Sequence, residues 1–128
     1  MFMGKYLNQT YALMRIMTGF LFMWHGSNKL LGYPSGVPSE APAHVLYIAG
    51  PIELIGGILV MIGLFTRWTA FLCSGLMACA YWMAHGTKAF LPAVNHGELA
   101  VVYCFVFLFI SAHGAGIWSL DSRRGRDT

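Results

Sequence analysis

Charged side chains are scarce in this chain. Of its 128 residues, only 10% are Asp, Glu, Lys or Arg, against about a quarter in an average soluble domain. Five residues are acidic, and 57% of the chain is hydrophobic. This composition leaves too few polar groups to cover a water-exposed surface. It excludes an ordinary soluble enzyme and predicts an integral membrane protein that contacts the lipid bilayer.

Positive charge is also limited. The formal net charge is +3, and the only basic cluster is formed by Arg123, Arg124 and Arg126 near the C-terminus. Proteins that bind nucleic acid concentrate Lys and Arg over one face, so we expect no nucleic-acid partner. The cluster is better explained as a signal for membrane orientation, because Lys and Arg accumulate on the cytoplasmic side.

Motifs for the common catalytic chemistries are absent. The three cysteines form no CxxC pair and no spacing typical of a metal site. The sequence has no glycine-rich phosphate loop, no GxSxG motif, and no HxxxH or ExxH spacing among its histidines. We therefore expect no metal site and no intrinsic cofactor.

Four apolar segments are long enough to cross a membrane, since about 20 helical residues span the hydrocarbon core. The sequence predicts an all-α fold, an integral membrane four-helix bundle in a single domain. The expected parts are spans at 11–31, 45–65, 68–85 and 97–113, outer loops at 32–44 and 86–96, and a cytoplasmic tail at 114–128.

Lys and Arg near the span ends predict the orientation. Placing both termini inside puts two of these cations, Lys29 and Lys88, on the outer side, and the larger group on the cytoplasmic side. That larger group comprises Lys5, Arg67, Arg123, Arg124 and Arg126. Both termini should therefore be cytoplasmic.

Two segments that end the first and third spans resemble each other. Met23-Trp-His-Gly-Ser-Asn-Lys29 is similar to Met83-Ala-His-Gly-Thr-Lys88. If the similarity reflects an internal repeat, the protein consists of two helical hairpins related by an axis along the membrane normal.

Glu53 lies inside the second predicted span. A carboxylate at that depth is unfavourable unless it faces protein or water. Ala49, Gly56 and Gly63 recur every seventh residue on the stripe of Glu53, so other helices can approach closely there. Glu53 is therefore either a ligand or proton site, or half of a buried ion pair with a cation of the first span that fixes helix register.

Polar residues of the first span share one helix face. Steps of four, three, four and three residues connect Arg15, Gly19, Phe22, Gly26 and Lys29. His25 lies beside them, and we expect this face to turn toward the other helices. Arg15 also has a simpler interpretation, as an anchor at the cytoplasmic interface or a partner of Asp121.

The third and fourth spans add further candidates. Tyr81 and His85 share a stripe of the third span, and His85 can face His25 across the bundle. Asn95-His-Gly-Glu98 fits a capping box at the start of the fourth span, which by itself would explain Glu98. Thr66 is expected to cap the third helix.

These residues together resemble the DoxX/DoxD family of small four-helix bacterial membrane proteins. The His85–Asn95 segment departs from the family pattern. The matching motifs are Arg15-x3-Gly19-x5-His25-Gly26-x2-Lys29-Leu30, Glu53-Leu-x-Gly56-Gly57-x5-Gly63-Leu-x-Thr66-Arg67, Gly97-Glu98 and Ser119-Leu120-Asp121. The resemblance covers nearly the whole chain and implies a multi-pass protein of the bacterial inner membrane.

The family name comes from subunits associated with quinone-linked sulfur oxidation and terminal oxidase activity. The resemblance therefore implies a quinone-linked redox or respiratory subunit with a polar site in the outer half of the bundle. If it is an enzyme, it would be a quinone-dependent oxidoreductase subunit, with a quinone as its ligand and partner redox subunits. Its catalytic residues would be Glu53, which relays the proton, and His25 or Lys29, which donates to a quinone carbonyl. Quinone-binding residues would be Arg15, Glu53, Tyr81, His85 and Glu98.

Two other hypotheses remain open at the level of sequence. One is a non-catalytic accessory or assembly subunit whose polar face holds helices together. The other is a small bundle that conducts protons or a small solute along the stripe of Glu53. Glycine-lined faces in so small a bundle also favour a homo-oligomer.

Overall fold

The described residues, 2–125 of a computed structural model, form helices and no strands. Arg126, the last member of the basic cluster, lies outside them. The all-α prediction is confirmed. The helices are η1 (Gly4–Tyr6), α1 (Leu7–Leu31), η2 (Val45–Ala49), α2 (Gly50–Ile62), α3 (Thr66–Ala84), α4 (Pro92–Asn95), α5 (Glu98–His113) and α6 (Leu120–Arg123).

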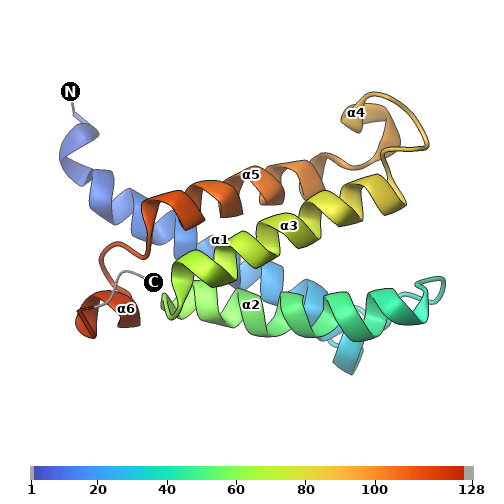
Figure 1. Cartoon of the computed structure of the whole chain (residues 1–128), viewed down its shortest axis with the longest axis horizontal. Helices are drawn as coiled ribbons and strands as arrows, with labels where there is room; N and C mark the ends of the chain where they lie inside the picture. Colours follow the sequence, from blue (N-terminus) through green and yellow to red (C-terminus); the bar gives the residue numbers. More distant parts are fainter. Residues whose placement is uncertain (1, 126–128) are drawn as a thin grey trace.

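The long helices pair into two hairpins. Helix α1 packs along α2, and α3 packs along α5, as the repeat in the sequence predicts. The hairpins then meet, mainly through α2 and α3. Figure 1 shows both chain ends and α6 at one end of the molecule, here called the terminal end. The connection 32–44 and the α4 segment lie at the other end, here called the loop end (Figure 1).

Glycines bring α1 and α2 into backbone contact. A Cβ atom on Gly19 would lie 2.5 Å from the carbonyl oxygen of Gly57, and a Cβ on Gly57 would lie 2.6 Å from the amide nitrogen of Met23. Gly26 faces the backbone of Gly50 in the same way. Because no side chain separates the helices at these points, polar groups on their facing sides are excluded from water.

At Gly56 the predicted glycine stripe does allow a close helix approach. A Cβ atom there would lie 2.7 Å from the Sγ atom of Cys73, so Gly56 faces α3. Gly57, one residue further along, makes the close approach to α1 instead. One residue corresponds to about 100° around a helix, so α2 uses adjacent glycines to contact two different neighbours.

A single π-helical turn, η2, leads into α2. Pro51, the second residue after it, has no amide hydrogen to donate to the preceding turn. The amide of Gly50 bonds to the carbonyl of Val45, five residues back. The wider turn lets the chain pass the proline ring without ending the helix, and Glu53 stands in the first turn after it.

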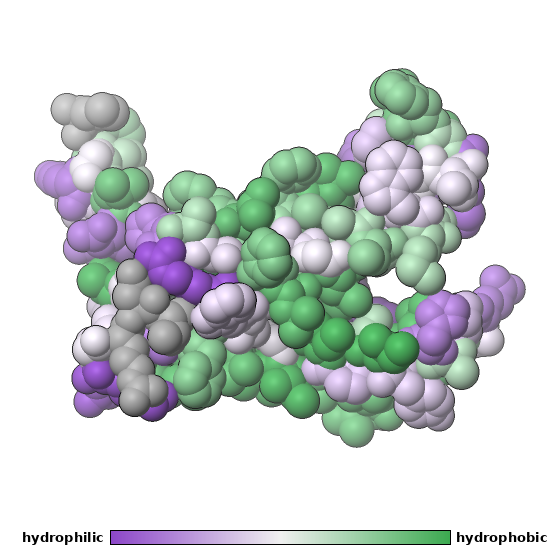
Figure 2. All heavy atoms as spheres, in the orientation of Figure 1, coloured by the Kyte–Doolittle hydropathy of each residue, from purple (hydrophilic) through white to green (hydrophobic). Residues whose placement is uncertain are grey.

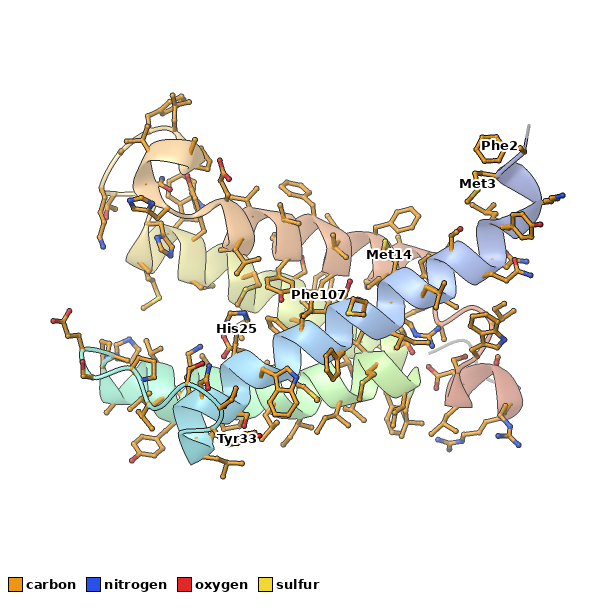
Figure 3. The ribbon with its side chains drawn as sticks, turned by 180° about the vertical axis from the view of Figure 1, so that it is seen from behind. Phe2, Met3, Met14, His25, Tyr33 and Phe107 are labelled. Carbon is orange, nitrogen blue, oxygen red and sulfur yellow. The ribbon has the colours of Figure 1, made fainter. Side chains whose placement is uncertain are left out.

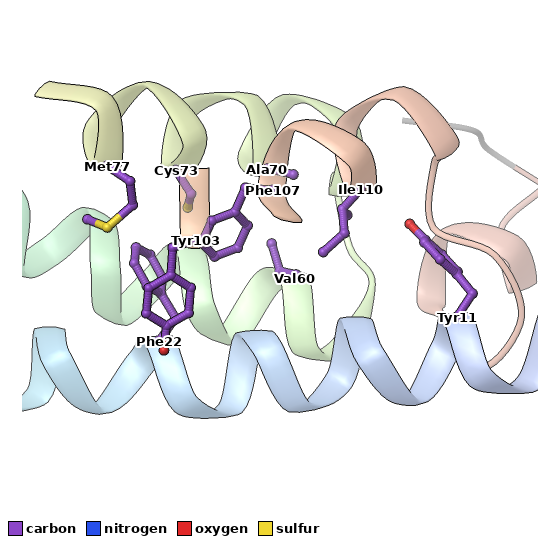
Figure 4. Packing of buried hydrophobic residues seen from close by; sticks show 9 residues of the cluster. All are labelled: Tyr11, Phe22, Val60, Ala70, Cys73, Met77, Tyr103, Phe107 and Ile110. Atoms are coloured by element: carbon purple, nitrogen blue, oxygen red, sulfur yellow. The ribbon is translucent and has the colours of Figure 1, made fainter. Parts of the chain in front are cut away.

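An aromatic cluster fills the centre between the hairpins (Figure 4). The Phe22 ring from α1 lies with its centroid 4.7 Å from that of Phe107 on α5, in an edge-to-face arrangement. It lies 5.0 Å from the ring of Tyr103. The full cluster comprises Tyr11, Phe22, Val60, Ala70, Cys73, Met77, Tyr103, Phe107 and Ile110. These contacts join all four long helices in one core.

Large hydrophobic side chains also cover the outside. Figure 2 shows hydrophobic residues over the middle of the visible face and hydrophilic residues at its two ends. In the described part of the chain, one helix, Val45–Ile62, is long and apolar enough to cross a membrane by length and composition. Helix α5 is also apolar but shorter.

Arg15 is fully buried, so the prediction that it anchors the chain at the interface is wrong. Its Nε donates to the carbonyl of Val60 at 3.1 Å, and its Nη2 donates to the carbonyl of Trp118 at 2.7 Å. Its Nη1 donates to the carbonyls of Ala115 and Ile117. A guanidinium has five donors in a fixed fork, and here it satisfies the free carbonyls of a non-helical segment.

The start of α3 is capped from the C-terminal segment. The carboxylate of Asp121 accepts hydrogen bonds from the Phe65 amide at 3.0 Å, the Thr66 amide at 2.9 Å and the Thr66 hydroxyl at 2.8 Å. The prediction that Thr66 caps this helix is therefore wrong, since Thr66 is its first residue and donates instead of accepting. A carboxylate is the better acceptor beside the positive end of the helix dipole.

Candidate functional site

Glu53 on α2 and Lys29 on α1 form a buried ion pair. Oε2 of Glu53 accepts a hydrogen bond from Nζ of Lys29 at 2.6 Å, and the two side chains are only 5% and 16% exposed. The contact of Gly26 with Gly50 lies three residues before each partner, so the close helix approach delivers the two side chains to the same place. The predicted ion pair is confirmed, and its cation is Lys29, not Arg15.

Glu53 also lines a cavity of about 210 Å³. Figure 3 shows His25, another of its lining residues, between α1 and the hairpin of α3 and α5. The lining therefore comes from all four long helices and from the loop before α5. It comprises Phe22, His25, Glu53, Met77, His85, His96, Leu99, Ala100 and Tyr103.

Three imidazoles and one carboxylate share this cavity. The His25 ring meets Tyr103 edge-on, with ring centroids 5.9 Å apart. Nδ1 of His85 lies 3.0 Å from the carbonyl oxygen of Asn95. Because a carbonyl only accepts, Nδ1 of His85 carries the proton in this contact, and Nε2 is left as an acceptor in the neutral ring. The cavity thus has both proton donors and proton acceptors.

Asn95 organises the loop that brings His96 to the cavity. Its buried side chain donates to the hydroxyl of Tyr81 and to the carbonyl of Ala89, both at 3.0 Å, and accepts from the amide of Gly97 at 2.9 Å. His96 follows in the left-handed region at φ 62°, which turns the chain into α5. Tyr81 therefore supports the loop and does not line the cavity.

The predicted capping box at the start of α5 is wrong. Gly97 is the N-cap residue, and no side chain caps this helix. Asn95 lies two residues before the N-cap position, with the left-handed turn at His96 between them, so its side chain closes the loop instead. Glu98 is exposed and does not line the cavity.

The structure thus brings some predicted site residues together and separates others. Glu53, His25 and His85 line one cavity. Lys29 does not line it, but donates a hydrogen bond to Glu53. Arg15 contacts the C-terminal segment, away from the cavity. The predicted binding roles of Arg15, Tyr81 and Glu98 have no support in the cavity lining.

Sequence reasoning missed Tyr103 as a site residue. It placed His96 among the ionisable groups at the outer rim but gave it no role. Tyr103 is the single tyrosine of the fourth predicted span. It lies four residues before Phe107 on the buried face of α5, and this combination of polarity and helical spacing was the available signal. His96 had no comparable signal, because its position depends on the loop that Asn95 organises.

The cavity has the chemistry for a small ring compound with oxygen substituents. Aromatic and aliphatic side chains can pack against the ring, imidazole nitrogens can donate to its oxygens, and a carboxylate can exchange a proton. Among the described residues, no group of three or more His, Cys, Asp or Glu side chains is placed to hold a metal ion.

Comparison with known proteins gives the family. The model of the DoxX family matches residues 10–86, which include Glu53, Lys29, His25 and His85. The chain belongs to the DoxX family. This confirms the resemblance found in the sequence, and the chain is a membrane protein of that family.

Relatives of this DoxX protein have been described mostly without a function. An uncharacterised protein of Haemophilus influenzae is 38% identical over 125 residues, which is 93% of each chain. A Bacillus subtilis protein named "Putative oxidoreductase CatD" is 39% identical over 59 residues, 43% of this chain and 44% of its own. A second uncharacterised Haemophilus influenzae protein is 27% identical over 103 residues, 77% of this chain and 68% of its own. No solved structure matches the chain.

Proposed function

We propose that this DoxX-family protein binds a quinone in the cavity beside Glu53 and acts as a quinone-linked redox subunit of the bacterial inner membrane. One observation carries the proposal. A buried carboxylate, three imidazoles and an aromatic wall share a single cavity between two hairpins that are covered with hydrophobic side chains. Such a site suits a ligand that arrives from the membrane.

In the proposed membrane placement, four helical segments cross the bilayer: α1, η2 together with α2, α3, and α5. Large hydrophobic side chains exposed on each of them support it, among them Leu21 on α1, Ile55 on α2, Leu72 on α3 and Phe105 on α5. The terminal end then faces the cytoplasm, because Lys5, Arg123 and Arg124 lie there. The cavity falls toward the outer side.

The quinone ring is the part that the cavity can hold. Pockets for drug-sized ligands measure roughly 300 to 1,000 Å³, so a cavity of about 210 Å³ suits one substituted ring, with its isoprenoid tail between the helices. The rings of Phe22 and Tyr103, whose planes are 59° apart, supply an apolar wall. His25 donates to a carbonyl oxygen of the quinone, and Glu53 exchanges a proton with it.

Reduction of a quinone to a quinol takes two electrons and two protons. Glu53 and the imidazoles supply protons at the ring oxygens. We propose that the electrons come from a partner redox subunit. The oxidoreductase name of the Bacillus subtilis relative supports a redox role, although the similarity to it covers less than half of this chain.

The test uses protein purified in mild detergent and loaded with a short-tailed benzoquinone. We expect the Glu53→Gln and His25→Gln variants to fold and to lose quinone, measured by equilibrium binding and by the absorbance of extracted quinone. Removing one hydrogen bond to a ligand lowers affinity by about tenfold. The matched controls are Glu98→Gln and His44→Gln, which remove the same groups from exposed positions outside the cavity.

Two outcomes would contradict the proposal. Equal quinone binding by all four variants would place the quinone elsewhere or nowhere. Unfolding of Glu53→Gln, together with unchanged quinone binding by His25→Gln, would favour a purely structural ion pair and the accessory-subunit hypothesis.

A further inference from the structure

The terminal end carries a depression that the quinone proposal does not use. It measures about 510 Å³ and lies where α6 and the preceding segment meet the end of α2. Its lining combines apolar and polar side chains, namely Ile62, Trp118, Ser119, Leu120, Ser122 and Arg123. Trp118 is 57% exposed and Leu120 is 38% exposed, which are high values for apolar residues beside a hollow.

Two buried contacts fix the position of this surface. Asp121, on α6, is fully buried and binds the start of α3. The carbonyl of Trp118 accepts from the buried Arg15. With these two anchors fixed, α6 turns Leu120 and Arg123 outward next to the exposed ring of Trp118. The apolar face and the adjacent cation are therefore parts of a defined structure.

Among the described residues, the exposed charges at this surface are of one sign. Arg123 and Arg124 are exposed, and neither forms an ion pair with a described residue. The guanidinium of Arg124 lies 5.6 Å from the centre of the exposed Phe65 ring, so a second cation stands over apolar surface. The acidic group of this segment, Asp121, is turned inward. An occupant must therefore combine an anionic head with an apolar chain.

We propose that this depression binds one anionic phospholipid of the cytoplasmic leaflet, with the phosphate at Arg123 and Arg124 and an acyl chain along Trp118, Leu120 and Ile62. Basic residues beside an aromatic residue at the membrane surface attract anionic headgroups. The proposal uses the membrane placement given above and is independent of the quinone site.

The test is native mass spectrometry of protein taken from bilayers that contain equal amounts of phosphatidylglycerol and phosphatidylcholine. We expect the wild type to retain one phosphatidylglycerol in preference to phosphatidylcholine. The Arg123→Gln/Arg124→Gln variant should lose this preference by roughly tenfold or more. The Lys5→Gln/Lys88→Gln variant removes the same charge from other exposed positions and should keep it.

The wild type supplies a second measurement that does not depend on any variant. Raising the salt concentration should weaken retention of phosphatidylglycerol much more than that of phosphatidylcholine. Equal retention of the two lipids would overturn the proposal. An equal loss of preference in both double variants would also overturn it, because it would show general attraction to charge. Complete displacement of the lipid by inorganic phosphate would overturn it too, because it would show a free phosphate site.

Discussion

Lys29 and Glu53 show how one ion pair can serve both packing and chemistry. Lys29 binds only Oε2 of the carboxylate, and Glu53 is also part of the cavity wall. The cation compensates a negative charge that would otherwise be buried beside α1. At the same time, it fixes where the carboxylate stands. The pair therefore keeps a carboxylate in the cavity wall, at a site where an isolated carboxylate would not be tolerated.

Removing the cation alone should destabilise the protein. We expect Lys29→Met to lower the free energy of unfolding by about 3 kcal/mol, because Glu53 is left buried without its partner. The measurement is denaturant unfolding in detergent, followed by circular dichroism. Lys88→Met is the matched control, since Lys88 is exposed at the loop end, and it should change little.

The double variant Lys29→Met/Glu53→Leu separates charge from packing. It should recover most of the lost stability, because no unpaired charge remains. A Lys29→Met variant as stable as the wild type would show that Glu53 does not depend on Lys29.

At this scale the sequence predicts partners better than it predicts roles. The helical spacing placed Lys29 on the buried face of the first span, and the need to compensate Glu53 made the pair predictable. Arg15 lies on the same face, yet three of its four acceptors are backbone carbonyls about 100 residues away in the chain. No local pattern identifies which carbonyls a distant non-helical segment leaves free.

Among the helices, the contact of α1 with α2 is the most exacting. Gly19, Gly26 and Gly57 let the two backbones touch, so this contact has no side chain that can move aside. The ion pair and the cavity both lie next to it. Their geometry therefore depends on the distance between these two helices.

A methyl group in this contact should separate the helices. We expect Gly19→Ala to lower the free energy of unfolding by about 1 to 3 kcal/mol, since its Cβ would lie 2.5 Å from both the Gly57 carbonyl oxygen and the Met61 amide nitrogen. Gly75→Ala is the control. It is exposed on α3 with no atom within 4 Å of its Cβ, and it should be neutral or stabilising by up to about 1 kcal/mol.

Thermal unfolding of both variants in the same detergent measures the difference. If Gly75→Ala were as destabilising as Gly19→Ala, intrinsic helix effects would explain both results. The close helix contact would then have no special role.

Helix positions were largely predictable, whereas the groups that cap the helices were not. Long apolar segments bounded by proline and glycine gave α1, α2, α3 and α5, because burial of apolar faces dominates their formation. The caps depend on tertiary contacts instead. Asp121 reaches the start of α3 from 55 residues away, and Asn95 is diverted from α5 into its own loop. The cavity residues that lie on helices could be predicted together with those helices. The position of His96 could not, because it depends on the loop before α5.

For the molecule as a whole, the position of the two chain ends limits how the chain can cross a membrane. Both chain ends lie at the terminal end, and the connection 32–44 and the α4 segment lie at the loop end (Figure 1). In a membrane this arrangement requires an even number of crossings. The proposed placement puts the terminal end in the cytoplasm, because more Lys and Arg lie there.

Cysteine labelling in intact cells tests this orientation. We expect Lys88→Cys to react with a membrane-impermeant maleimide applied from outside, and Lys5→Cys to react only after the cells are permeabilised. Both are exposed lysines, so the substitutions are matched. The unsubstituted chain controls for its own cysteines, of which Cys79 is exposed. The reverse pattern would invert the orientation, and labelling of both from outside would exclude the crossing pattern.

The contacts that hold the C-terminal segment against the rest of the protein have a consequence for biosynthesis. Arg15 is synthesised about 100 residues before three of its four acceptors, the carbonyls of Ala115, Ile117 and Trp118. Asp121, which completes the start of α3, is made after them. Until this segment is synthesised, the nascent chain has only the Val60 carbonyl to accept from Arg15, and α3 has no cap. A chain that stops before Ala115 would keep both defects.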